Sequence, residues 1–208
     1  MRTTDDEILG ALTANSEFAV ELPQRSAWLR EIEVLRASLS PFAGGGWVFF
    51  EFVLPRLGRR MDVAVVVGHL LFVIEFKVGE NEFQRSAIDQ VWDYALDLKN
   101  FHQSSHAIYI VPVLIATGAA PRAVAYREPA ADGVFRPVLA TPDCLDKVIA
   151  LHLASTHGPA IDGLTWERGR YSPTPTIVEA ARELYAGHAV DEISRSDAGA
   201  VNLNRPGF

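Results

Sequence analysis

The sequence has little cysteine, no long hydrophobic run and no excess of positive charge, and each shortage excludes a class of protein. A single cysteine, Cys144, among 208 residues excludes a disulfide framework and a cysteine zinc site, and is typical of the cytoplasm. The apolar runs are far shorter than the ~18 residues that a membrane span needs. The polar and acidic stretch Met1–Glu7 is unlike a signal peptide. A net charge of −7 argues against general coating of nucleic acid. We therefore expect a cytoplasmic protein with no membrane partner.

The composition is that of a folded globular protein, with 49% apolar and 22% charged residues. The length allows one sizeable domain with a proper core and a small appendage. We expect a domain over residues 1–160 whose core spans 24–116, followed by a helical extension and polar linker tail over 161–208.

The hydrophobic pattern predicts an alternation of helices and short strands. Helices are expected at Gln24–Leu39, Ser86–His102, Leu145–Thr156 and Ile177–His188, and strands at Trp47–Leu54, Val63–Val67, Leu70–Ile74, Ala107–Ala116 and Val138–Ala140. This order predicts an α/β sandwich with a small mixed sheet. Pro112 indicates an edge position or a bulge for its strand. We also expect Phe18–Val20 and Leu22 to pack on the body of the domain.

Three charged residues stand out at the ends of two buried strands that Gly68 and His69 separate. Asp62 precedes the first strand, and Glu75 and Lys77 end the second. Because side chains alternate along a strand, Glu75 and Lys77 point to one face and Phe76 to the other. Ionised groups on central strands are costly to bury unless they are paired or bind a metal. The pattern therefore indicates either a site or an ion pair of Lys77 with Asp62 or Glu75.

The chemistry of these side chains favours a divalent metal. Asp62 and Glu75 offer hard oxygen ligands suited to Mg²⁺ or Mn²⁺, and the backbone carbonyl of Phe76 offers a further oxygen. Lys77 is a compact cation that can orient or deprotonate a water, or stabilise the charge of a phosphate.

Other polar residues are placed to support such a site. On a helical wheel Glu31 lies about 80° from the centre of the apolar arc, where it either reaches the site or remains a surface charge. Gln90 and Tyr94 are four residues apart and share one helix face. Glu51 interrupts an apolar strand, and we expect it to be a charge at the sheet surface rather than a second acidic contributor.

A basic turn leads into the hairpin and carries Arg56, Arg59 and Arg60. We expect these arginines to lie near Asp62. There they either contact the phosphates of a nucleic acid or form a solvated turn.

The arrangement resembles the PD-(D/E)xK nuclease superfamily, which has the restriction-endonuclease-like fold. The acidic residue of the signature corresponds to Asp62 and the (D/E)xK element to Glu75, Phe76 and Lys77. The proline that names the motif is absent before Asp62. Family members often carry an acidic residue on the first helix, which here corresponds to Glu31. The resemblance implies a Mg²⁺- or Mn²⁺-dependent phosphodiesterase in which Asp62, Glu75, the Phe76 carbonyl and Glu31 hold the metal.

The stretch QVWDY, from Gln90 to Tyr94, is similar to the Q-x-x-x-Y element of the exonuclease-like branch of this superfamily. In that branch, which includes the nuclease domain of RecB-like enzymes, the glutamine and tyrosine help to position the DNA. The resemblance implies action on DNA, at ends or on single strands.

Longer stretches resemble the N-terminal region of uncharacterised bacterial proteins in which a nuclease-like domain precedes a P-loop, helicase-like ATPase. These stretches are PRLGRRMDV, FVIEFKVG, DQVWDYALDLKNFH and EISRSDAGA. Because the chain has no G-x-x-x-x-G-K-[ST] motif, either the ATPase belongs to a longer form of the chain, or the protein stands alone, or it works with a separate ATPase partner. Phage defence and DNA repair both fit. A homodimer, a non-cleaving nucleic-acid-binding module of the ATPase and an RNA-directed nuclease stay open as alternatives.

Overall fold

The computed structural model describes residues 3–15, 21–174 and 177. The helices are α1 (Asp5–Ala14), α2 (Leu22–Leu39), α3 (Arg85–Phe101), α4 (Leu145–Ser155) and α5 (Gly163–Glu167), and the strands are β1 (Gly46–Leu54), β2 (Arg59–Val67), β3 (Leu70–Lys77), β4 (Tyr109–Ala116) and β5 (Val138–Ala140). Two expected segments lie outside the described residues: Phe18–Val20 and the polar tail 189–208. The expected helix Ile177–His188 lies outside them too, except for Ile177.

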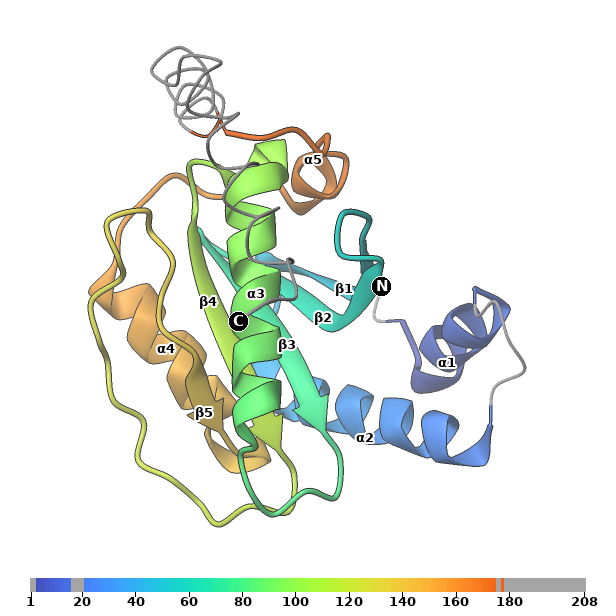
Figure 1. The fold of residues 1–208 in the computed structure, drawn as a ribbon. Helices are drawn as coiled ribbons and strands as arrows, with labels where there is room; N and C mark the ends of the chain where they lie inside the picture. The colour runs from blue at the N-terminus through green and yellow to red at the C-terminus, as the bar shows by residue number, and fades with distance from the viewer. Residues whose placement is uncertain (1–2, 16–20, 175–176, 178–208) are drawn as a thin grey trace, which may run out of the picture.

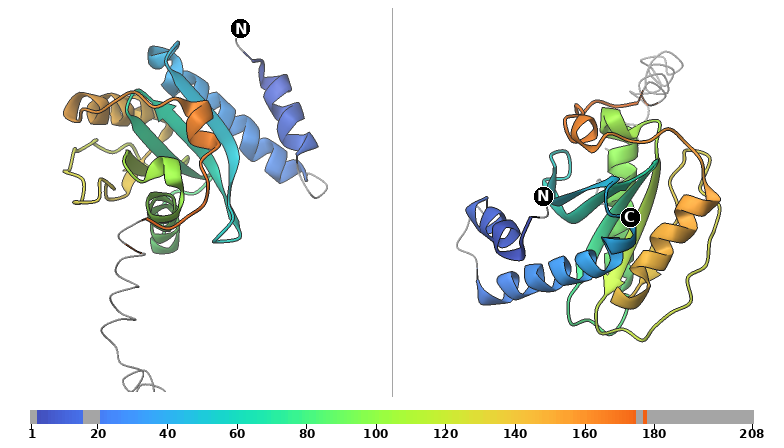
Figure 2. Two further views of the ribbon diagram at one scale, coloured as in Figure 1. Left: turned by 90° about the horizontal axis from the view of Figure 1, so that it is seen from above. Right: turned by 180° about the vertical axis from the view of Figure 1, so that it is seen from behind.

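The five strands form one mixed sheet in the order β1-β2-β3-β4-β5. The first three strands pair antiparallel, whereas β4 runs parallel to both β3 and β5. The sheet lies between α3 on one side and α2 with α4 on the other (Figure 1; Figure 2, left). The α/β sandwich with a small mixed sheet is therefore confirmed.

The central hairpin forms because its apolar residues are buried on both faces. Every residue from Leu70 to Phe76 is buried, and so is every residue from Val63 to Val67. Gly68 adopts a φ of +59°, a conformation that favours glycine, and so allows the tight turn between the strands. One face of the hairpin packs with α2 and α4, and the other packs with α3. Strands that are apolar on both faces belong in the middle of a layered domain.

The expectation that Pro112 marks an edge strand is wrong, since β4 lies between β3 and β5. The Ile110 N–H donates to the Gly133 carbonyl at 3.1 Å, on the β5 side of the strand. Two residues further on, the nitrogen of Pro112 faces the same side. The β4–β5 ladder begins only at Val113, after an isolated bridge between Ile110 and Val134. The proline therefore occupies the gap where no donor is required.

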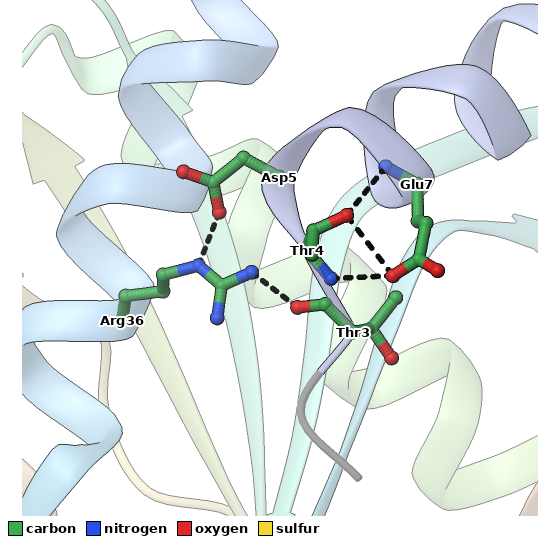
Figure 3. Close-up of polar contacts among 5 residues, drawn as sticks. All are labelled: Thr3, Thr4, Asp5, Glu7 and Arg36. Carbon is green, nitrogen blue, oxygen red and sulfur yellow. Dashed lines mark hydrogen bonds and ion pairs between the residues drawn. The ribbon is translucent and has the colours of Figure 1, made fainter.

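The helix α1, which the hydrophobic pattern left unassigned, begins with a capping box. The Thr4 hydroxyl accepts the Glu7 N–H, and the Glu7 carboxylate accepts the Thr4 N–H at 2.6 Å (Figure 3). Arg36 of α2 bonds the Asp5 carboxylate and the Thr3 carbonyl, which fixes α1 beside α2. Leu22, expected to pack on the body, is instead 80% exposed at the first turn of α2.

None of the helices that the structure describes is both long and apolar enough to span a membrane.

Candidate active site

The candidate site lies where the β2–β3 ladder opens. The pairing of these strands ends at Val63 and Ile74. Beyond this point the Asp62 carboxylate takes the place of a ladder carbonyl, because its Oδ2 accepts the Phe76 N–H at 2.7 Å. In a strand the N–H and C=O of one residue face the same neighbour, so the Phe76 carbonyl also faces this opening. Asp62 and the Phe76 carbonyl are thus brought together, as expected from the sequence.

The side chains of β1 and β2 switch from one face of the sheet to the other at the same place. Val63 packs in the cluster with α2 and α4, whereas Met61 packs in the cluster with α3, and the paired residues of β1 do the same. Residues two apart on a regular strand share a face, so Glu51 and Asp62 lie at a local irregularity. Glu51 has a φ of +50°, a left-handed conformation that costs on the order of 1–3 kcal/mol for a residue other than glycine. Side chains from both helical layers can therefore reach this point.

Glu75 is the centre of the hydrogen-bond network. Its side chain is almost fully buried, and its Oε1 accepts the Lys77 Nζ at 2.9 Å and the Gln90 Nε2 at 2.8 Å. The Gln90 Nε2 also lies 2.7 Å from the Tyr94 hydroxyl, and Lys77 Nζ lies 3.4 Å from the Gln90 Oε1. Glu75 Oε2 is buried without a hydrogen bond, although the Asp62 N–H lies near enough to lower the pKa of the carboxyl. The end of β3 and one face of α3 thus converge on this carboxylate.

The neighbouring carboxylates disfavour one another's charge. Burial, followed by the charges of Glu51 and Glu75, raises the pKa of Glu31 to about 7. Burial, followed by the charges of Glu75 and Glu31, raises the pKa of Asp62 well above its usual range. Burial raises the pKa of Glu75 as well, although the hydrogen bond from Lys77 opposes the shift. A cation among these groups would stabilise their charged forms.

Lys77 supplies one such cation. Burial lowers the pKa of Lys77, but the hydrogen bond and the charge of Glu75, together with the charge of Asp62, leave it above its ordinary value. Burial raises the pKa of Tyr94, so its hydroxyl stays neutral and can hydrogen-bond Gln90. The Lys77 ammonium is therefore held next to the acidic cluster, which consists of Glu31, Glu51, Asp62 and Glu75.

The acidic cluster includes Glu51, which we had expected to be a surface charge. Its Oε1 accepts the Trp28 indole N–H at 2.8 Å, and its Oε2 lies 3.6 Å from the Arg60 Nε. Its charge also raises the pKa of Glu31 and of Glu75. The signal in the sequence was its position as the only polar residue of an apolar strand. Glu31 is itself 6% exposed, so the helix-flank residue does point inward.

The basic turn differs from expectation at Arg56. Its Nε lies 2.5 Å from Asp97 Oδ1 on α3, and its guanidinium carbon lies 4.1 Å from the centroid of the Phe101 ring. Asp97 is buried, so this arginine neutralises a carboxylate of the core and does not point to Asp62. Arg60 is paired with Glu51. Arg59 is exposed and has no ion pair among the described residues, and its expected phosphate contact stays a prediction.

The described residues contain no group of three or more His, Cys, Asp or Glu side chains already arranged to hold a metal ion. Lys77 and Gln90 instead occupy Glu75 Oε1. The donors nevertheless suit Mg²⁺ or Mn²⁺, because they are hard oxygens and because Glu75 Oε2 is buried without a hydrogen bond. Asp62 and Glu75 are the residues that fit a divalent cation.

Comparison of the chain with protein-family models, with curated proteins and with solved structures gave no match.

Proposed function

We propose that the chain is a metal-dependent nuclease of the PD-(D/E)xK superfamily that hydrolyses phosphodiester bonds in DNA. The observation that carries this proposal is the environment of Glu75. A buried carboxylate at the end of a central strand contacts Lys77 and Gln90, and Asp62 stands on the neighbouring strand. A structural ion pair would not require further buried carboxylates that raise one another's pKa.

The acidic residues would hold the metal. Asp62 and Glu75 would be direct ligands, the Phe76 carbonyl would offer a backbone oxygen, and Glu31 would add a carboxylate from α2. When bound, Mg²⁺ supplies Lewis-acid stabilisation of phosphate charge and lowers the pKa of water. Because its pKa is raised to about 7, Glu31 exchanges a proton with solvent near neutral pH.

Lys77 would bind the phosphate and stabilise the negative charge that develops there during hydrolysis. Gln90 fixes the position of Lys77 and Glu75, since it contacts both. Tyr94 lies in turn against the Gln90 amide and limits its rotation. These contacts explain why a Q-x-x-x-Y spacing on α3 suits a catalytic lysine on β3.

A second candidate function is a non-cleaving nucleic-acid-binding module that works with an ATPase partner. The ion pair of Lys77 with Glu75 favours this alternative, because it gives both groups a structural role. The intact set of Asp62, Glu75 and Lys77 favours the nuclease.

Incubation with labelled single- and double-stranded DNA and RNA, in Mg²⁺, in Mn²⁺ and in chelator, distinguishes these functions. The nuclease proposal expects cleavage of DNA that requires the metal. Binding without cleavage in any condition would support the non-cleaving module, and cleavage of RNA alone would indicate an RNA-directed nuclease.

A further inference from the structure

The connection between β4 and β5, residues 117–137, carries three exposed arginines: Arg122, Arg127 and Arg136. These arginines contrast with the net charge of −7 of the chain as a whole. None of the three forms an ion pair with a carboxylate in the described part of the chain. Three cations thus remain available to a ligand.

The acidic residues of the same connection are engaged locally. The Asp132 Oδ1 accepts the Val134 N–H at 2.9 Å, and the Glu128 Oε2 accepts the Tyr126 hydroxyl at 3.2 Å. These contacts hold the two carboxylates against their own segment. They do not neutralise the arginines.

Two of the arginines lie over aromatic rings. The guanidinium carbon of Arg122 lies 5.1 Å from the centroid of Phe83, and that of Arg136 lies 6.0 Å from the centroid of Trp92. Both rings are partly exposed. Such cation–π contacts orient the guanidinium group while leaving its N–H donors free for an anion.

A groove joins the three arginines and Phe83. A cavity of about 280 Å³ is lined by all three arginines, and a neighbouring one of about 440 Å³ is lined by Phe83, Arg122 and Asn81. The two cavities share Arg122 and Leu139 and therefore adjoin. Glu82 at one rim is the acidic residue that lines this groove in the described chain. Basic and aromatic side chains therefore line one continuous surface depression.

The groove starts at the sheet edge where the candidate catalytic residues lie. Because β3 and β4 are parallel, their carboxyl ends meet there, with Lys77 paired to Ala116. The Thr117 N–H donates to the Lys77 carbonyl at 3.2 Å, and the Gly118 N–H donates to the Glu80 carbonyl at 2.9 Å. The arginine-bearing connection therefore leaves the sheet beside the carboxyl end of β3 (Figure 1).

We propose that this groove binds a single-stranded nucleic acid and leads it to Lys77, with phosphates on Arg122 and Arg136 and bases stacked near Phe83. This inference rests on the proposed function and names its substrate form. Stacking on protein rings requires bases that are not already stacked in a duplex, which favours a single strand. The arginines supply the salt-dependent contacts with the phosphates.

Fluorescence anisotropy with a labelled single-stranded oligonucleotide of about 20 bases tests the groove, in chelator so that no cleavage occurs. The variant Arg122→Gln/Arg136→Gln loses two phosphate contacts. At about 0.1 M salt we expect binding roughly 25-fold weaker, with the slope of log K against log salt reduced by about 1.4. The control Arg25→Gln/Arg30→Gln removes the same charge from α2 and is expected to bind as wild type does. Phe83→Leu is expected to weaken binding while leaving the slope unchanged.

The outcomes separate this inference from the nuclease proposal. Cleavage by the wild type with unchanged binding in Arg122→Gln/Arg136→Gln would overturn the groove and leave the nuclease. Arginine-dependent binding without cleavage would support the groove and contradict the nuclease. Tighter binding of duplex than of single strand, equal competition by polyglutamate, or no binding of any nucleic acid would overturn the groove.

Discussion

The Asp62 carboxylate accepts the Phe76 N–H at 2.7 Å, at the point where the β2–β3 ladder stops. This bond ties two strands together through a side chain and opens the sheet beside Glu75. Around this opening the carboxylates of α2, β2 and β3 have raised pKa values, to which the charges of neighbouring carboxylates, including Glu51 of β1, contribute.

Replacing Lys77 with methionine is expected to reduce DNA cleavage by about 10²–10³-fold, because the charge that stabilises the reacting phosphate is lost. Oligonucleotide binding should change much less. Lys147→Met on α4, which removes an exposed lysine far from the site, provides the control in a single-turnover assay. Full cleavage by Lys77→Met would show that Lys77 is not catalytic.

Replacing Asp62 with asparagine is expected to abolish stabilisation by Mg²⁺. At a Mg²⁺ concentration about 100 times its Kd, the wild type should gain about 2.7 kcal/mol in unfolding free energy. The variant should gain almost nothing, although its amide oxygen can still accept the Phe76 N–H. Thermal unfolding with increasing Mg²⁺ measures this, with the exposed Asp93→Asn as control. An equal Tm increase in wild type and Asp62→Asn would exclude Asp62 as a ligand.

Glu31 should make the metal-free protein less stable as the pH rises. Its pKa is about 7 in the fold and 4.5 in the unfolded chain, so folding favours the protonated form. The stability of the wild type therefore falls between pH 4.5 and 7, by about 3 kcal/mol, and this loss persists above pH 7.

The variant Glu31→Gln lacks this titration, so its stability relative to wild type should increase by that amount from pH 4.5 to 8. Urea unfolding in chelator at several pH values measures the difference. Glu33→Gln, on the same helix but exposed and paired with Arg30, is the matched control. A pH-independent difference between Glu31→Gln and wild type would mean that folding does not raise the pKa of Glu31.

Arg56 should matter for stability rather than for contact with DNA. Arg56→Met leaves the buried Asp97 without its partner, and we expect a loss of about 2 kcal/mol. Adding Asp97→Asn should recover part of that loss, whereas Arg59→Met should change stability by less than about 0.5 kcal/mol. A stable Arg56→Met variant with weakened DNA binding would contradict this assignment.

Local periodicity explains why part of the site could be predicted from the sequence. Glu75 and Lys77 are two apart on a strand, and Gln90 and Tyr94 are four apart on a helix. These spacings determine which side chains share a face of one element. The packing of α3 on β3, which the spacings do not predict, then brings the two pairs together. The buried hairpin follows from its apolar runs in the same way.

Other features depend on contacts that no local pattern contains. Arg56 and Asp97 are far apart in the sequence, and their pairing depends on how α3 lies against the turn before β2. Glu51 points into the site because of its left-handed conformation, which glutamate rarely adopts. The helix α1 was different, since Thr4 and Glu7 carry a capping-box spacing that could have predicted it.

The central claim is that Asp62 and Glu75 hold a divalent cation next to Lys77. Anomalous diffraction from crystals soaked in Mn²⁺, at a concentration that supports cleavage, tests it most directly. The account predicts a single anomalous peak within about 2.0–2.6 Å of carboxylate oxygens of both Asp62 and Glu75. An anomalous map without a peak at these carboxylates, with Lys77 still bound to Glu75, would contradict it.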